Sequence, residues 1–171
     1  MVLAAKPDPY GLGAIPPIPT WIPAVAVDAD HPLLLVSPKS RARTHSIHGN
    51  QTRLARIDRD DVWINSADAA ARGIVDGDTV RVFNARGATV LPAHVTGKIA
   101  PGVVSIKEGA WFTPDAEGTD RAGCANVLSE DRSAPCGATT YNTNQVQMER
   151  AGSGQRTPAP SPLYGRREVK G

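Results

Sequence analysis

The stretch from Val62 to Ile106 constrains the fold most, because it packs short apolar strands between tight turns rich in glycine and aspartate. Within it, residues 79–84 alternate between polar and apolar side chains, as a half-buried strand does. We expect a short helix over Ala67–Arg72, capped by Ser66, and a reversal in which Gly87 supplies a positive φ. Short strands joined in this way are typical of a compact β-barrel, whose chemistry lies in its loops.

The same reasoning extends to both sides of this stretch. An apolar run ended by Pro38 predicts a buried strand, and an alternating segment near residue 147 predicts the last strand of the sheet. The expected strands are Leu33–Ser37, Val62–Asn65, Thr79–Asn84, Ala88–Thr96, Val103–Ile106 and Gln145–Glu149. Helical turns are predicted at residues 51–59 and 123–129.

Composition divides the chain into three parts. Residues 1–30 are rich in proline, glycine and alanine and predict an extended strap or linker, because proline fixes φ and restricts the residue before it. Residues 31–151 form the predicted barrel. Residues 152–171 are Gly-, Ser-, Pro- and Arg-rich, which predicts a disordered tail. No apolar run approaches the ~20 residues of a membrane span.

Charge and cysteine content exclude several classes of function. The tail holds four of the 19 basic and one of the 17 acidic residues, which leaves a net charge of −1 elsewhere and argues against a nucleic-acid-binding face. Two cysteines with no Cys-x-x-Cys pair encode neither a zinc ribbon nor an iron–sulfur cluster. The acidic residues fall in turns, where we expect solvated caps.

Hydrogen-bond donors are concentrated in the loop that follows the first predicted strand. Arginine can hold phosphate with two parallel hydrogen bonds, and histidine or asparagine can bind the edge of a heteroaromatic ring. His45 and His48 have the spacing of two metal ligands, but no third ligand accompanies them. The loop is therefore a candidate polar ligand site or a solvated basic loop. Its donors are Lys39, Arg41, Arg43, Thr44, His45, Ser46, His48 and Asn50.

A series of ordered motifs resembles one protein family. The segment from Pro32 to Arg150 is similar to the C-terminal domain of molybdenum enzymes of the dimethyl sulfoxide reductase family, which binds molybdopterin guanine dinucleotide. The sequences of the later motifs are most similar to the catalytic A chain of membrane-complex dimethyl sulfoxide reductases. The motifs are Arg43–Ser46, Val62–Ala69, Arg72–Gly87, Pro101–Val104, Glu108–Trp111, Gly123–Leu128 and Tyr141–Gln147.

The resemblance implies a fold and a set of site residues. The fold is mainly β: a six-stranded double-psi β-barrel, as in aspartate decarboxylase-like proteins, with short helices and long loops. Implied cofactor contacts are Arg43, Thr44, His45, Ser46, Asn126, Tyr141, Asn142, Thr143 and Asn144; no catalytic or metal-ligating residue is implied. Asn126 could instead cap a turn, Tyr141 could belong to the core, and Trp111 is expected to pack as an apolar side chain.

The implied function is to cover a molybdopterin guanine dinucleotide, with molybdenum or tungsten held mainly by other domains, in an oxidoreductase that reduces S- or N-oxides. The expected partners are upstream domains of the catalytic subunit and iron–sulfur and membrane-anchor subunits. The chain then corresponds to a fragment or a split subunit, inactive alone, in the cytoplasm or the periplasm. The alternative is a non-enzymatic double-psi or swapped-hairpin barrel that binds DNA or a peptide.

Overall fold

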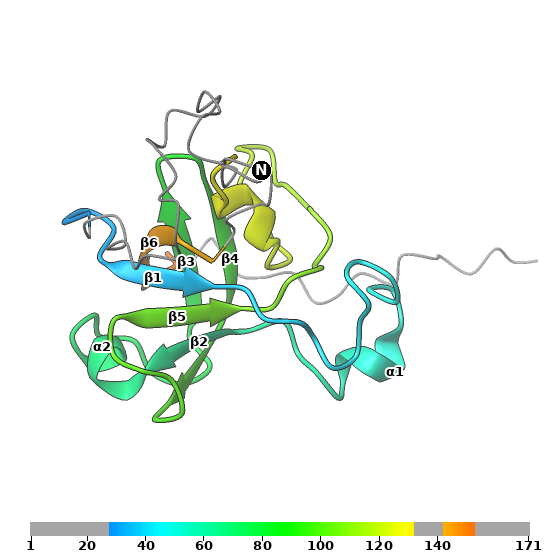
Figure 1. Cartoon of the computed structure of the whole chain (residues 1–171), viewed down its shortest axis with the longest axis horizontal. Helices are drawn as coiled ribbons and strands as arrows, with labels where there is room; N and C mark the ends of the chain where they lie inside the picture. The colour runs from blue at the N-terminus through cyan, green and yellow to red at the C-terminus, as the bar shows by residue number, and fades with distance from the viewer. Residues whose placement is uncertain (1–27, 132–141, 153–171) are drawn as a thin grey trace, which may run out of the picture.

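A computed structural model describes residues 28–131 and 142–152 of the chain. Within these residues the chain forms six strands, two short α-helices and one 3₁₀-helix (Figure 1). The predicted strap and tail lie outside the described residues, apart from 28–30 and 152. In chain order the elements are β1 Leu33–Val36, α1 Thr52–Ala55, β2 Val62–Asn65, α2 Ser66–Ala70, β3 Thr79–Asn84, β4 Gly87–Thr96, β5 Val103–Ile106, the 3₁₀-helix η2 Ala125–Leu128 and β6 Asn144–Arg150.

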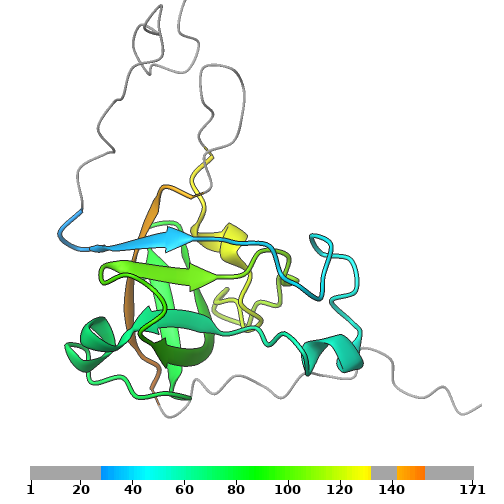
Figure 2. The same cartoon turned by 60° about the horizontal axis from the view of Figure 1, so that its bottom comes forward.

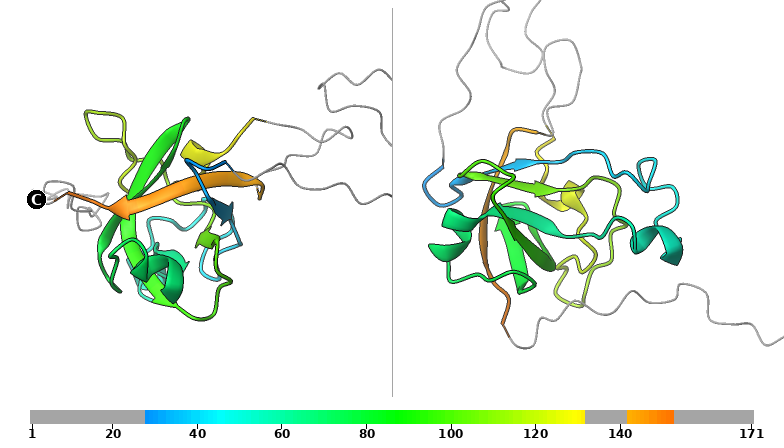
Figure 3. Two further views of the ribbon diagram at one scale, coloured as in Figure 1. Left: turned by 90° about the vertical axis from the view of Figure 1, so that its left-hand side faces the viewer. Right: turned by 90° about the horizontal axis from the view of Figure 1, so that it is seen from below.

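The six strands form a closed barrel in the order β1-β5-β2-β4-β3-β6. Two pairs, β1 with β5 and β2 with β4, are parallel, and the other four are antiparallel. In Figure 3, β6 (orange) lies alongside β3 and completes the wall. Closure leaves no exposed sheet edge. The predicted fold class, a mainly β, six-stranded double-psi β-barrel with short helices and long loops, is confirmed.

Alternating side chains fill the barrel interior. In β1, Leu33 and Leu35 point inward and are no more than 1% exposed, while Val80 and Val82 do the same from β3. Each such fully buried aliphatic side chain stabilises the fold by about 1.5–3 kcal/mol. In β4, residues 88–91 are all buried, because the loop between β5 and β6 covers the outer face of this strand.

Three of the loops that connect strands lie at the same end of the barrel, because of the directions in which the strands run. β1 and β5 run toward this end, and β6 and β2, antiparallel to them, start from it. Figure 2 shows β1, β5 and β2 side by side, with α1 beyond this end and α2 at the other. We call residues 37–61, 84–87, 107–131 and 142–143 the loop end of the barrel, and α2 with residues 97–102 the α2 end.

Two local predictions were wrong. The cap of α2 is Asn65, whose side chain accepts a hydrogen bond from the Ala67 amide at 2.9 Å, so Ser66 is the first helical residue. Gly87 does not have a positive φ. Its hydrogen is required because a Cβ there would lie 2.8 Å from the Val127 carbonyl oxygen. The glycine thus permits η2 to pack against the start of β4.

Candidate functional site

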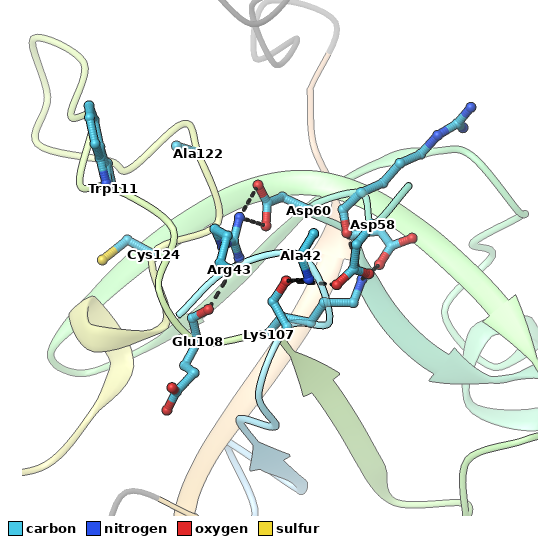
Figure 4. Close-up of polar contacts among 12 residues, drawn as sticks. Ala42, Arg43, Asp58, Asp60, Lys107, Glu108, Trp111, Ala122 and Cys124 are labelled. Carbon is cyan, nitrogen blue, oxygen red and sulfur yellow. Dashed lines mark hydrogen bonds and ion pairs between the residues drawn. The ribbon is translucent and has the colours of Figure 1, made fainter. Parts of the chain in front are cut away.

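Arg43 ties three segments of the loop end together (Figure 4). Its Nη1 donates to both carboxylate oxygens of Asp60 at 2.7 Å, and Nη2 donates to the Glu108 carbonyl oxygen at 3.1 Å. The side chain is 7% exposed. Its Nε is the single buried side-chain nitrogen or oxygen without a hydrogen-bond partner in the described part of the chain. The arginine therefore connects the loop after β1 to the residues before β2 and to the residues after β5.

A second cation, Lys107, makes a parallel connection. Its ammonium group lies 3.1 Å from Asp58, 2.9 Å from Asp61 and 2.6 Å from the Arg59 carbonyl oxygen. Burial of Asp58 opposes its ionisation, but hydrogen bonds from Ser40, the Arg41 amide and Lys107 outweigh burial and hold the pKa of this carboxyl below its ordinary value. The acidic segment before β2 thus binds one cation from each neighbouring loop.

Asp120 organises the long loop between β5 and β6. The carboxylate is fully buried and accepts hydrogen bonds from the Thr89 hydroxyl at 2.6 Å and from the backbone amides of Thr113, Ala122 and Cys124. Buried polar groups require such partners, since an unsatisfied one costs about 1–3 kcal/mol. This carboxylate therefore holds the loop on β4 and places η2 beside it.

The loop after β1 presents Thr44, His45 and Ser46 to solvent. His45 has a left-handed backbone with a φ of 52°, and Gly109 lies directly beneath its carbonyl group. The His45 ring lies 3.1 Å from the Glu108 carboxylate and 3.3 Å from the Lys39 ammonium group. Lys39 and Glu108 are themselves paired at 2.7 Å. Exposed donors therefore sit on a loop whose base is held by ionic contacts.

Trp111 supports the same loop from below. Its indole nitrogen donates to the Ser46 carbonyl oxygen at 2.8 Å, and its ring lies against Gly49, where a Cβ would be 3.0 Å from the indole nitrogen. The side chain is nevertheless 42% exposed. The expected packing role is therefore accompanied by a polar contact and an open face.

Asn126 and the start of β6 contribute the remaining polar groups. Asn126 is exposed on η2, and its side chain makes no hydrogen bond among the described residues. Asn142 and Thr143 are exposed, and the Asn142 side chain accepts from the Ser37 amide at 2.8 Å. Asn144, by contrast, is 2% exposed and accepts from Glu130 and Arg86. Tyr141 lies outside the described residues.

The structure therefore places seven of the nine implied site residues at the loop end, and an eighth, Asn144, next to it as the first residue of β6. Six of these eight are exposed there, whereas Arg43 and Asn144 are engaged in internal contacts. Their exposed groups are hydroxyls, amides and an imidazole, which can bind the edges of a pterin or guanine ring and the oxygens of a phosphate. The six are Thr44, His45, Ser46, Asn126, Asn142 and Thr143.

Sequence reasoning missed the acidic residues that support this surface. Asp58 and Asp120 were expected as solvated caps, but both are buried. Asp58-Arg-Asp-Asp immediately precedes a strand and carries three carboxylates near the basic loop in sequence. This proximity of opposite charges was a usable signal for pairing with Arg43 and Lys107. Asp120 offered no such signal, because its partners are mostly backbone amides.

Two searches of the described residues bear on alternatives. No group of three or more His, Cys, Asp or Glu side chains in residues 28–131 and 142–152 is arranged to hold a metal ion. Within the same residues, no helix has the length and apolar character needed to cross a membrane.

Comparison with known proteins identifies the family. The family model described as "Molydopterin dinucleotide binding domain" matches residues 33–146. The chain belongs to this family of molybdopterin dinucleotide-binding domains, found in dimethyl sulfoxide and trimethylamine-N-oxide reductases, and the resemblance seen in the sequence is confirmed.

Relatives of known name are similar over most of the chain. Dimethyl sulfoxide reductase DmsA of Escherichia coli is 40% identical over 142 residues, which are 80% of this chain and 17% of the relative. Dimethyl sulfoxide/trimethylamine N-oxide reductase of Cereibacter sphaeroides is 42% identical over 135 residues, 72% of this chain and 16% of the relative. The chain thus spans less than a fifth of the length of these relatives.

A solved structure supports the fold. Acetylene hydratase from Pelobacter acetylenicus superimposes with a TM-score of 0.67 at 15% sequence identity, covering 79% of this chain and 21% of that protein. At this level of identity the similarity concerns the barrel and its connections.

Proposed function

We propose that this chain binds molybdopterin guanine dinucleotide with the loop end of its barrel. The observation that carries the proposal is the convergence of the loops after β1 and β5 and the start of β6 at one end, where Ser37 contacts Asn142 and Pro38 contacts Glu108. These loops present the exposed donors of a family whose ligand is a molybdopterin dinucleotide.

The donor set fits this cofactor chemically. Main-chain and side-chain groups of Thr44, His45 and Ser46 can bind phosphate oxygens or ring edges, and Asn126 offers both a donor and an acceptor to a pterin or guanine edge. The loops carry these groups in a fixed arrangement before any ligand arrives, which reduces the entropic cost of binding. When bound, the molybdenum centre would supply two-electron oxygen-atom transfer; this chain orients and hydrogen-bonds the organic part.

We further propose that the chain acts within a larger oxidoreductase that reduces S- or N-oxides. Its relatives include reductases named for dimethyl sulfoxide, trimethylamine N-oxide and biotin sulfoxide. The partners are upstream domains of a catalytic subunit, joined by iron–sulfur and membrane-anchor subunits. Exposed apolar side chains on the loops of the barrel, Ile47, Trp111 and Phe112, support contact with such domains.

The cofactor proposal is tested by nuclear magnetic resonance of the full, ¹⁵N-labelled chain. The probe is metal-free, oxidised molybdopterin guanine dinucleotide, with guanosine diphosphate as the nucleotide half. We expect amide shifts confined to the loop end, which remain measurable even at millimolar dissociation constants. Absence of shifts at millimolar probe, or shifts centred on the α2 end, would contradict the proposal.

Two substitutions give the residue-level test. His45→Ala and Asn126→Ala each remove one side-chain hydrogen bond worth about 0.5–1.5 kcal/mol, which corresponds to roughly 2- to 10-fold weaker binding. Lys98→Ala is the matched control, because Lys98 is exposed in the turn between β4 and β5 at the α2 end. Equal losses in all three variants would show that the loop end has no special role.

A further inference from the structure

Arg43 is placed to act on other residues of the loop end. Its Nη1 donates to both carboxylate oxygens of Asp60, and its Nη2 donates to the Glu108 carbonyl oxygen. Hydrogen bonds between a guanidinium and a carboxylate are charge-assisted and roughly twice as strong as neutral ones. The three connected segments are the loop after β1, the residues before β2 and the residues after β5.

Little space remains beside Arg43 for a ligand. The side chain is 7% exposed, and its Nε is buried without a partner. The hollow lined by Arg43, Asp58 and Asp60 has a volume of about 20 Å³. This is room for about one water molecule. A phosphate group could reach the guanidinium only after the contact with Asp60 had opened.

The residues held by Arg43 continue to the exposed donors. Thr44 follows Arg43 directly, and the Thr44 carbonyl oxygen accepts from the Ile47 amide at 3.0 Å, which closes the turn containing His45 and Ser46. On the other side, the Glu108 carbonyl oxygen accepts from Arg43 while its carboxylate contacts the His45 ring. The backbone beneath His45 is Gly109, the next residue. Arg43 thus fixes the distance between the two segments that support His45, the loop after β1 and the residues after β5.

We propose that Arg43 is a positioning residue that acts through Asp60, and that the direct cofactor contacts of this loop belong to Thr44, His45 and Ser46. The inference rests on the proposed function and refines it, since a loop arginine next to a phosphate-binding site would otherwise be assigned to the phosphate. Breaking the contact between Arg43 and Asp60 does not remove the hydrogen-bond donors, but it allows the loop to adopt several conformations. Apparent affinity then falls in proportion to the fraction that remains competent to bind.

Asp60→Asn separates the two roles by the sign of its effect. If Arg43 positions the loop, Asp60→Asn and Arg43→Ala each weaken binding of the dinucleotide probe, roughly tenfold if about a tenth of the chains keep the competent loop. The double variant then loses little more than either single variant, because the two residues form one unit. If Arg43 binds phosphate directly, Asp60→Asn frees the guanidinium, so binding is unchanged or tighter while Arg43→Ala still weakens it.

The controls separate loop positioning from general loss of stability. Asp68→Asn removes the charge of a carboxylate at the α2 end, where Asp68 accepts from the Gly102 amide at 2.7 Å. We expect it to lower the unfolding temperature without changing the dissociation constant. Arg43→Lys keeps the positive charge but loses the second guanidinium nitrogen. This variant should bind the probe with intermediate affinity. The same resonance spectra report whether each variant is folded.

Each outcome decides a different statement. The inference is supported if the natural chain binds the probe and if Asp60→Asn and Arg43→Ala each weaken that binding. Binding that Asp60→Asn leaves unchanged or strengthens overturns it, while the proposed function stands. Absence of probe binding by the natural chain overturns the proposed function itself. Weakening by Asp68→Asn equal to that by Asp60→Asn would show a merely structural effect and overturn the positioning role.

Discussion

Substitution of Gly109 by alanine tests how closely the two supporting loops approach each other. Gly109 has a φ of 91°, and a Cβ at this position would overlap the His45 carbonyl group. An L-residue held at such a φ costs about 1–3 kcal/mol. Overpacking against backbone costs about another 1–3 kcal/mol. Gly109→Ala is therefore expected to lower the free energy of unfolding by about 2–6 kcal/mol, a large share of the 5–15 kcal/mol typical of a domain.

Gly118→Ala is the matched control for this prediction. Gly118 has a φ of 83° in the same long loop, but no heavy atom lies within 4 Å of a Cβ built there. It should therefore show the backbone cost alone, about 1–3 kcal/mol. Urea unfolding followed by circular dichroism measures both variants, and the difference between them isolates the contact with His45. Equal destabilisation by the two substitutions would refute the close approach.

Three further predictions concern buried groups. Asp120→Asn should lower the free energy of unfolding in urea by about 1–3 kcal/mol, because the asparagine side chain cannot accept all four hydrogen bonds. Thr89→Val removes only one of these hydrogen bonds. A smaller loss of stability in Asp120→Asn than in Thr89→Val would contradict the prediction. The pKa of Asp58 lies below its ordinary 3.8 in the fold, so its contribution to stability is complete above that value and is lost as pH falls through the folded pKa. Asp58→Asn should therefore reduce stability at pH 7 and flatten the acid decline below about pH 4, measured by thermal unfolding. Burial raises the pKa of the Cys124 thiol, so in a Cys136→Ser background iodoacetamide at pH 8 should label Cys124 only when urea unfolds the chain; rapid labelling of the native protein would contradict its burial.

The barrel was predictable because its strands carry local signals. β2, β3 and β5 begin and end at the predicted residues, and their apolar side chains alternate or run without interruption between turns. The order of strands around the barrel has no local signal, since β1 pairs with β5 and β6 across about 70 and 110 residues of intervening chain. The resemblance to a family implied the class of barrel, and the order itself was not predicted.

The wrong local predictions share a physical cause, which is contact with a distant segment. Ser66 and Asn65 are both good caps, and the end of β2 selected Asn65, whose amide also donates to the Ile99 carbonyl oxygen at 2.7 Å. Gly87 was assigned a positive φ from its place in a turn, but its hydrogen is needed for the approach of Val127, 40 residues later. Neither partner is visible within a local window of sequence.

The roles of the donors at the loop end also depend on contacts with distant segments, which a local window of sequence does not show. Arg43 and His45 are two residues apart in one polar loop, and residue type alone gives both the same role. Asp60, on a segment that closes back over the loop, takes the guanidinium and leaves the imidazole exposed. A buried charge needs a partner of opposite sign, and the carboxylate beside the arginine is the reason we propose support of the loop, and not ligand contact, as its role. Site assignment in such loops therefore depends on first pairing every buried charge, and only the groups left exposed are candidates for cofactor contact.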